Sequence, residues 1–156
     1  MEPLEEVVVR RLTASRKTLA VAESCSGGLI AHRITNVPGA SEIFLGGLVA
    51  YSNAAKMTVL GVREEHLLRE GAVSEATARA MAEGARRLFQ SDYAVSATGI
   101  AGPGGGTTDK PVGLVYIAVA RADETRAARC SFSGDREYIK RQTADKALNM
   151  LVEWLA

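Results

Sequence analysis

The stretch "ESCSGG" at residues 23–28 follows an apolar run and precedes a helical pattern. Ser24 and Cys25 carry nucleophilic groups, and the glycines that follow leave neighbouring backbone N–H groups accessible. A glycine-rich turn that opens a helix can bind an anion or stabilise the oxyanion of an acyl-transfer reaction. The stretch therefore predicts a hydroxyl nucleophile beside a place where negative charge can develop.

Both residues also have a plainer structural interpretation. A serine ahead of a helix is more often an N-cap than a nucleophile. A cysteine in such a place more often packs as a small hydrophobe than reacts. A reactive Ser24 therefore requires a base elsewhere in the chain.

The two histidines are poor candidates for that base. His32 falls in the helical pattern after the turn and His66 in the charged stretch "REEHLLRE", where surface histidines are expected. Lysine also activates serine when burial or neighbouring cations keep it neutral. Lys56 lies one helical turn after the strand-end "YSN", so it is the candidate base. Tyr51, at the same strand end, could supply a phenolic hydrogen bond or a ring against a planar ligand.

The elements that would position these residues alternate between strand and helix. Helical patterns are expected to residue 15, over 28–34 and 53–60, from Ser74, and over 135–155; strands are expected over 18–23, 43–52, 93–98, 114–121 and 125–132. In the helix after Ser74 the inner face is expected to hold Ala78, Met81, Ala82, Ala85, Leu88 and Phe89. The order predicts an α/β fold with a mixed, mostly parallel five-stranded sheet between two helical layers.

Three polar or glycine-rich segments follow the first three strands. They are "ESCSGG", "YSNAAK" and the start of the long loop "GIAGPGGGTTDKPVG". In open α/β sheets, ligands bind beyond the carboxyl ends of the strands. The three segments are therefore expected to converge at one site.

The composition restricts the class of protein. A chain of 156 residues suits one domain spanning residues 1–156, and 47% hydrophobic with 24% charged residues indicates a folded globule. With a net charge of +1 and 5% aromatic residues, no nucleic-acid partner is expected. Two distant cysteines suggest a reduced setting and no metal site. The acidic start "MEPLEE" is unlike a signal peptide and no run has membrane-spanning length, so a soluble cytoplasmic protein is expected.

Five segments together resemble the CinA C-terminal domain family: "AESCSGGLIAHRIT", "VPGASEIFLGGLVAYSNAAKMTVLGV", "GAVSEATARAMA", "ATGIAGPGGGTTDKPVGLVYIA" and "GDREYIKRQTADKAL". The likeness runs from about Thr18 to Leu155, with no sign of the larger N-terminal domain that CinA proteins carry. Its several ordered motifs make the likeness specific.

The resemblance implies a three-layer α/β/α sandwich and an enzyme. Active members, including stand-alone proteins of the PncC type, hydrolyse the carboxamide of nicotinamide mononucleotide to nicotinate mononucleotide and ammonia in pyridine nucleotide recycling. The family's serine and lysine dyad falls on Ser24 and Lys56, and its strand-end tyrosine on Tyr51. The reaction needs no metal or organic cofactor. Homo-oligomers, often dimers, are usual.

The substrate-binding residues expected on this hypothesis belong to three groups. The turn would hold the oxyanion through backbone N–H groups near Cys25, Ser26, Gly27 and Gly28. The substrate's phosphate would lie on a backbone cradle formed by the loop at Thr98, Gly99 and Gly102. Arg136 or Arg141 would supply charge, and Gln142 accompanies Arg141 in a family segment lining the site, although both arginines could simply be solvated.

Two positions depart from the family pattern. Ser26 replaces a threonine and keeps the hydroxyl, whereas Gly104 stands where the family usually has an aspartate that could order the loop or the ribose.

Two rival functions remain. One rival is a cysteine amidase with Cys25 as nucleophile, activated by a helix N-terminus. The other is a non-catalytic interaction domain, in keeping with the competence and DNA-damage labels of CinA proteins.

Overall fold

The computed structural model describes residues 1–155, whose strands and helices largely follow the predicted order. The elements are α1 (Leu4–Ser15), β1 (Leu19–Glu23), α2 (Leu29–Thr35), a 3-10 turn (Ala40–Glu42), β2 (Phe44–Val49), α3 (Asn53–Leu60), α4 (Glu64–Glu70), α5 (Glu75–Phe89), β3 (Tyr93–Gly99), β4 (Leu114–Arg121), β5 (Glu124–Ser131) and α6 (Arg136–Trp154). No helix in this part of the chain is both long and apolar enough to cross a bilayer.

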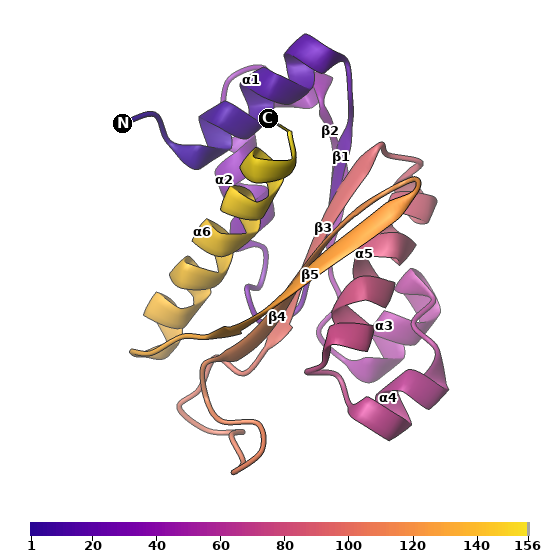
Figure 1. Cartoon of the computed structure of the whole chain (residues 1–156), viewed down its shortest axis with the longest axis vertical. Helices are drawn as coiled ribbons and strands as arrows, with labels where there is room; N and C mark the ends of the chain where they lie inside the picture. The colour runs from indigo at the N-terminus through magenta and orange to yellow at the C-terminus, as the bar shows by residue number, and fades with distance from the viewer. Residues whose placement is uncertain (156) are drawn as a thin grey trace.

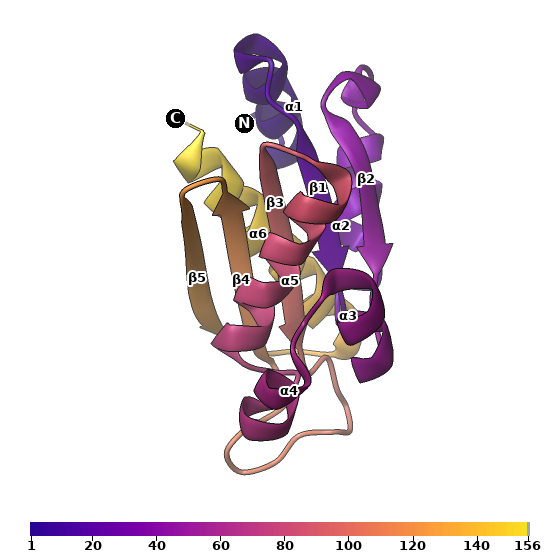
Figure 2. The ribbon, with the colours of Figure 1, turned by 90° about the vertical axis from the view of Figure 1, so that its right-hand side faces the viewer.

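The five strands form one sheet in the order β2-β1-β3-β4-β5. β1 pairs in parallel with β2 and β3, while β4 is antiparallel to both β3 and β5. Four strands therefore run in one direction and β4 runs against them (Figure 2), which confirms the mixed, mostly parallel sheet.

Helices cover both faces of this sheet, as predicted. α1, α2 and α6 lie on one face and α3 and α5 on the other (Figure 1). All five residues of β1 are buried, because this central strand is covered on both faces. Leu19 and Val21 pack toward the α1 and α6 side, whereas Ala20 and Ala22 pack toward α5. The predicted three-layer sandwich is confirmed.

The sequence patterns missed or misplaced three local features. The charged stretch at residues 64–70 is a helix, α4, anchored by the buried side chain of Leu67. β2 ends at Val49, earlier than predicted, because the chain turns there to reach Ser52, whose hydroxyl caps α3 by accepting from Ala55 N–H at 3.0 Å. The placement of Leu88 on the inner face of α5 is wrong, since its side chain is exposed.

Leu88 is exposed because Phe89 occupies the inner face of the last turn of α5. The ring of Phe89 occupies the space above Gly46, where an added Cβ would come within 2.4 Å of it. Phe89 therefore fills the inner face of this turn and Leu88 points outward.

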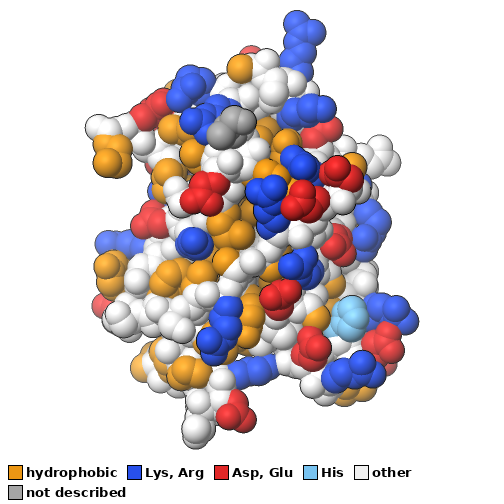
Figure 3. Space-filling model, in the orientation of Figure 1, with side chains coloured by type: hydrophobic (Ala, Val, Ile, Leu, Met, Phe, Trp, Pro, Cys, Tyr) orange, Lys and Arg blue, Asp and Glu red, His pale blue; other side chains and the backbone are white. Residues whose placement is uncertain are grey.

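On the face shown in Figure 3, acidic and basic side chains are interspersed, in agreement with the balanced composition.

Candidate active site

Ser24 and Lys56 lie in direct contact at the carboxyl end of β1. Ser24 follows the strand, and its N–H donates to the carbonyl of Ala97 on β3 at 2.9 Å. Lys56 lies in α3, and its Nζ is 2.9 Å from Ser24 Oγ. The exposed fractions of the two residues are 7% and 1%. The structure thus brings the candidate nucleophile and base together in a nearly dry environment.

The surroundings of Lys56 favour its neutral form. Burial lowers the pKa of the Lys56 amine below its ordinary value, while nearby Cys25 has a smaller, opposite effect. Among residues 1–155 no carboxylate forms an ion pair with Lys56. Its other two partners are the carbonyl oxygens of Ala50 and Tyr51, at 2.9 and 3.0 Å.

These three partners suit both protonation states of the amine. A neutral amine has two N–H donors for the carbonyls of Ala50 and Tyr51 and one lone pair for the hydroxyl of Ser24. The ammonium form has three donors for the same three oxygens. Lys56 can therefore take up and release a proton without changing its partners.

The turn after Ser24 exposes backbone donors. Gly27 and Gly28 have φ angles of 61° and 101°, a left-handed conformation that glycine adopts without strain. Gly27 N–H donates back to the carbonyl of Ser24 at 3.1 Å, which closes the turn. Within the described chain, the N–H groups of Cys25, Ser26 and Gly28 have no protein acceptor. These free donors next to Ser24 could stabilise an oxyanion.

Glu23 holds this turn in place, a role that the sequence analysis missed. Its side chain is buried, and its two carboxylate oxygens accept from the N–H groups of Ile30 and Ala31, both at 3.0 Å. The carboxylate thereby caps α2, whose N-cap residue, Gly28, has no side chain to do so. A charged residue at the end of a buried strand was the available signal, because such a group needs partners.

Tyr51 and Arg136 connect the second strand end to the glycine-rich loop. Arg136 donates from Nη2 to the Tyr51 hydroxyl at 2.8 Å and from Nη1 to the carbonyl of Gly102 at 2.6 Å. The Tyr51 hydroxyl therefore contacts Arg136, while the backbone carbonyl of the same residue contacts Lys56. The three predicted segments do converge at the carboxyl ends of β1, β2 and β3.

Thr98 and Gly99, the last two residues of β3, have packing roles. Thr98 is buried, and its hydroxyl donates to the carbonyl of Ala72 at 2.9 Å. An added Cβ at Gly99 would lie 2.6 Å from the carbonyl oxygen of Leu114, so glycine permits the close approach of β4. Both residues fix the start of the loop against its neighbours.

A pocket of about 380 Å³ lies beside the turn, between α2 and α6. It is lined by Ser26, Gly27, Gly28, Leu29, His32, Glu137, Lys140 and Arg141. Arg141 was a predicted site residue, whereas Lys140 was missed, although it lies one helical turn after Arg136. The structure does not bring Gln142 to this pocket, because its amide donates to the carbonyls of Ser133 and Tyr138 at 2.8 and 3.2 Å.

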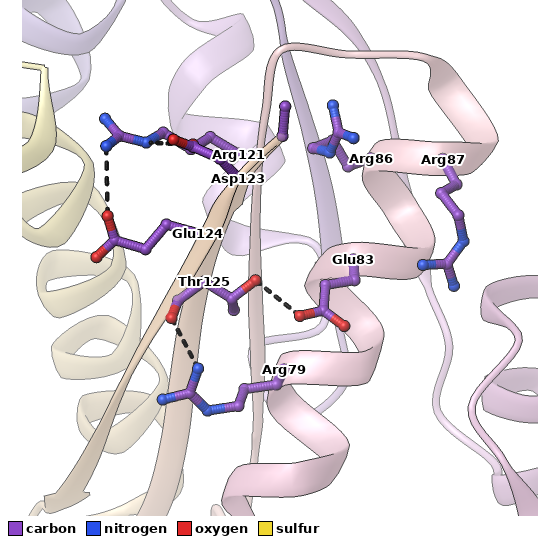
Figure 4. A pocket seen from close by; sticks show the side chains of 9 residues that line it. Arg79, Glu83, Arg86, Arg87, Arg121, Asp123, Glu124 and Thr125 are labelled. Carbon is purple, nitrogen blue, oxygen red and sulfur yellow. Dashed lines mark hydrogen bonds and ion pairs between the residues drawn. The ribbon is translucent and has the colours of Figure 1, made fainter.

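A second pocket, of about 410 Å³, lies near the opposite end of the sheet between α5 and the β4–β5 turn (Figure 4). Its polar side chains are largely engaged with one another. Arg79 donates to the carbonyl of Thr125, whose hydroxyl donates to Glu83, both at 2.7 Å. Arg121 pairs with Asp123 at 3.1 Å. Its lining residues include no serine, cysteine or lysine, so the candidate active site is the one around Ser24.

Two relatives with similar sequences are longer than this chain. CinA-like proteins from Thermotoga maritima and Anaeromyxobacter sp. (strain K) are 51% and 52% identical over 154 and 150 residues, which is 99% and 96% of this chain. The chain spans only 38% and 37% of the length of those two relatives.

Solved structures match over nearly their whole length. The competence/damage inducible protein CihA from Agrobacterium tumefaciens is 39% identical with a TM-score of 0.93, and the match covers 98% of this chain and 97% of that one. A competence-damaged protein (CinA) superfamily protein from Enterobacter cloacae is 33% identical with a TM-score of 0.95, covering 98% and 90%. The family model of the CinA C-terminal domain matches residues 1–155. The chain therefore belongs to the CinA C-terminal domain family.

Proposed function

We propose that this chain is a nicotinamide-nucleotide amidase, which hydrolyses the carboxamide of nicotinamide mononucleotide to nicotinate mononucleotide and ammonia. The observation that carries the proposal is the buried contact of 2.9 Å between Lys56 Nζ and Ser24 Oγ, with a lysine whose pKa is lowered. The substrate follows from the motifs that the chain shares with active family members.

The first half of the reaction forms an acyl-enzyme. Neutral Lys56 takes the hydroxyl proton of Ser24 as Oγ attacks the carboxamide carbon. The N–H groups of Cys25 and Ser26 donate to the oxyanion of the tetrahedral intermediate. The ammonium of Lys56 then gives its proton to the leaving nitrogen, the C–N bond breaks, and ammonia departs.

The second half releases the acid. Lys56, neutral again, takes a proton from a water molecule that attacks the ester carbonyl. The same N–H groups hold the second oxyanion, and the proton returns to Ser24 Oγ as the C–O bond of the ester breaks. One amide and one water thus give one carboxylic acid and one ammonia, with Ser24 and Lys56 restored.

The cost of burying Lys56 argues against a purely structural domain. Burial without a carboxylate partner destabilises the charged form of the Lys56 amine. Groups with such perturbed pKa values cluster at functional sites. The rival interaction domain matches the competence and damage wording in the names of relatives. That reading gives no reason for a buried lysine held against a serine.

The proposal also includes the setting of the enzyme. Cys25 and Cys130 are both free and buried, which suits a reducing cytoplasm. We expect a homodimer, as the family likeness implies, and a small-molecule nucleotide as the ligand. Sedimentation velocity of the purified chain tests the dimer, and a single monomeric species at working concentration would contradict it.

The decisive experiment is ammonia release from nicotinamide mononucleotide by the purified chain and its Ser24→Ala and Lys56→Ala variants. Loss of a nucleophile or its base is expected to lower kcat by about 1,000-fold or more. The exposed Lys17→Ala and Ser131→Ala variants are the matched controls, and thermal unfolding verifies that every variant is folded. A folded wild type without ammonia release overturns the proposal, and an active Ser24→Ala variant overturns the dyad.

A further inference from the structure

Helix α3, which carries Lys56, lies beside α5 on one face of the sheet (Figure 2). The buried residues of α3 are Lys56 and Leu60. They are four positions apart, so they lie on the same face of the helix, one turn from each other. One contact face of α3 therefore holds both the proposed base and the residue that anchors the helix.

The backbone of α3 touches α5 at Gly84. This glycine is buried in the interior of α5, and a Cβ added to it would lie 1.9 Å from the carbonyl oxygen of Leu60 and 2.9 Å from the carbonyl carbon. Glycine weakens the interior of a helix, because it loses more conformational freedom on folding than any other residue. Here it allows two helix backbones to approach at a distance that a residue with a Cβ does not permit.

Gly84→Ala would displace α3 relative to α5. Ordinary contact with a Cβ begins at 3.4 Å, so the separation of 1.9 Å must grow by about 1.5 Å. The opposing atom belongs to the backbone, so no side-chain rotation relieves the clash. Ser24 is held by the sheet, since its N–H donates to the carbonyl of Ala97 on β3 at 2.9 Å. A displacement of this size therefore takes Lys56 Nζ out of hydrogen-bond distance of Ser24 Oγ, from which it now lies 2.9 Å away.

We infer that Gly84 is a positioning residue for the proposed dyad, because its lack of a side chain lets α3 dock closely enough on α5 for Lys56 to reach Ser24. The inference rests on the proposed function, since it concerns the base of the same reaction. Gly84 acts through α3 and takes no part in the chemistry itself. It also lies outside the five segments that carry the family likeness.

Steady-state kinetics of Gly84→Ala test this role. We expect kcat for nicotinamide mononucleotide to fall by about 10- to 100-fold, the usual effect of a displacement of about 1 Å at a reacting group, with KM within about twofold of wild type. The acid limb of kcat/KM should also move to higher pH, because water that reaches a displaced Lys56 reverses part of the burial that lowers its pKa. A loss of folded protein alone would lower the apparent kcat without moving this limb.

Ala82→Gly is the matched control on the same helix. Ala82 is fully buried and packs with Ala118 and Ala120 on β4, so removing its methyl group destabilises α5 without pressing on α3. This variant should unfold at a lower temperature, while kcat and the acid limb keep their wild-type values. The same kinetic changes in Ala82→Gly as in Gly84→Ala would trace them to general destabilisation and overturn the inference.

Labelling by phenylmethylsulfonyl fluoride measures the reactivity of Ser24 without the nucleotide, with Ser24→Ala as the blank. The Ser24 hydroxyl attacks the sulfur, the S–F bond breaks, and fluoride leaves as Lys56 takes the proton. The labelling rate, followed by the mass of the intact chain, should fall by about 10-fold or more in Gly84→Ala. If Gly84→Ala does not fold, Leu60→Ala decides in its place, because loss of the buried anchor of α3 should lower the same rate. An unchanged rate in that variant would then overturn the inference.

The outcomes separate the inference from the proposed function. If the wild type releases ammonia and folded Gly84→Ala keeps the wild-type kcat or the wild-type acid limb, the inference is overturned while the proposed function stands. If the wild type releases no ammonia but its Ser24 is labelled at a rate that falls in Gly84→Ala, the proposed function fails and the inference stands. A wild type that neither releases ammonia nor is labelled at Ser24 overturns both.

Discussion

The Nζ atom of Lys56 lies 2.9 Å from the Oγ atom of Ser24, although 32 positions separate the two residues. The pairing of β1 with β2 explains this contact. In their parallel register Glu23 is opposite Val49, so both strands end at the same level. Ser24 follows one strand directly, and the first turn of α3 brings Lys56 back over the end of the other. The contact between Ser24 and Lys56 is thus a consequence of strand register and one helical turn.

Activity should rise with pH through the pKa of Lys56. Only the neutral amine can take the proton of Ser24, and burial lowers the pKa of Lys56 below its ordinary value of 10.5. The acid limb of kcat/KM against pH should therefore have its midpoint below 10.5. Lys56→Arg, which cannot become neutral, should abolish activity at every pH. An acid limb that is identical in a still-active Lys56→Arg variant would assign the titration to another group.

The pH dependence of the free energy of unfolding should also reflect the lowered pKa of Lys56. The unfolded chain keeps its Lys56 proton up to a higher pH than the folded chain does, because the folded pKa is the lowered one. Between the two pKa values the unfolded state binds more protons, so the free energy of unfolding rises with pH in that window. Urea titrations should show this rise in the wild type and its loss in Lys56→Met. An equal rise in both proteins would contradict the shift.

Cys25→Ala should retain activity. Burial raises the pKa of the Cys25 thiol to about 12, so the thiol remains protonated and weakly nucleophilic near neutral pH. We expect kcat/KM within about twofold of wild type and a stability loss of about 1 kcal/mol from the removed buried sulfur. Slow alkylation of the wild-type Cys25 thiol by iodoacetamide at pH 8 would provide a second measurement of its raised pKa. A folded but inactive Cys25→Ala variant would instead indicate that the Cys25 thiol is the nucleophile.

Glu23→Gln should destabilise the protein and slow the reaction. A glutamine offers one oxygen where Glu23 uses two, so either Ile30 N–H or Ala31 N–H faces an amide group that cannot accept. The expected loss is about 1 to 3 kcal/mol in the free energy of unfolding. A lower kcat should accompany it, since the turn with the proposed oxyanion donors is held less firmly. Glu6→Gln, on the exposed side of α1, is the control, and equal stability of the two variants would contradict the capping role.

The convergence of the site residues could be predicted because it depends on short-range patterns. Apolar runs that end in polar residues mark strand ends, and parallel strands bring those ends to one edge of the sheet. Ser24, Tyr51 and Lys56 lie within a few residues of such ends. Their approach to one another, and to the glycine-rich loop, is therefore predictable from the sequence alone.

The placements of Gln142, Lys140 and α4 could not be predicted, because they depend on how distant helices are oriented. Gln142 follows Arg141 directly, but adjacent helical residues point about 100° apart, so only one lines the pocket. Lys140 approaches the turn only because α6 packs beside α2, a relationship between segments more than 100 residues apart. α4 carries no clear apolar period, since Leu67 is its one buried residue within the described chain. Sequence periodicity contains none of these relationships.

Gly104→Asp should fold normally and bind the substrate more tightly. Gly104 is exposed, its φ lies outside the left-handed region, and an added Cβ meets no atom within 4 Å, so an aspartate fits without strain. Replacing glycine there removes freedom from the unfolded chain and should stabilise the protein by about 0.5 kcal/mol. A carboxylate at this position could also accept hydrogen bonds from ribose hydroxyls.

Kinetics of Gly104→Asp and Gly104→Ala separate these two effects. Both variants should show the small gain in stability, since both lose the flexibility of glycine. Only the aspartate variant should lower KM for nicotinamide mononucleotide, by about threefold to tenfold, because only it adds an acceptor for the ribose. Equal KM values in the two variants would mean that the carboxylate makes no contact with substrate, and that the family's aspartate acts on the loop alone.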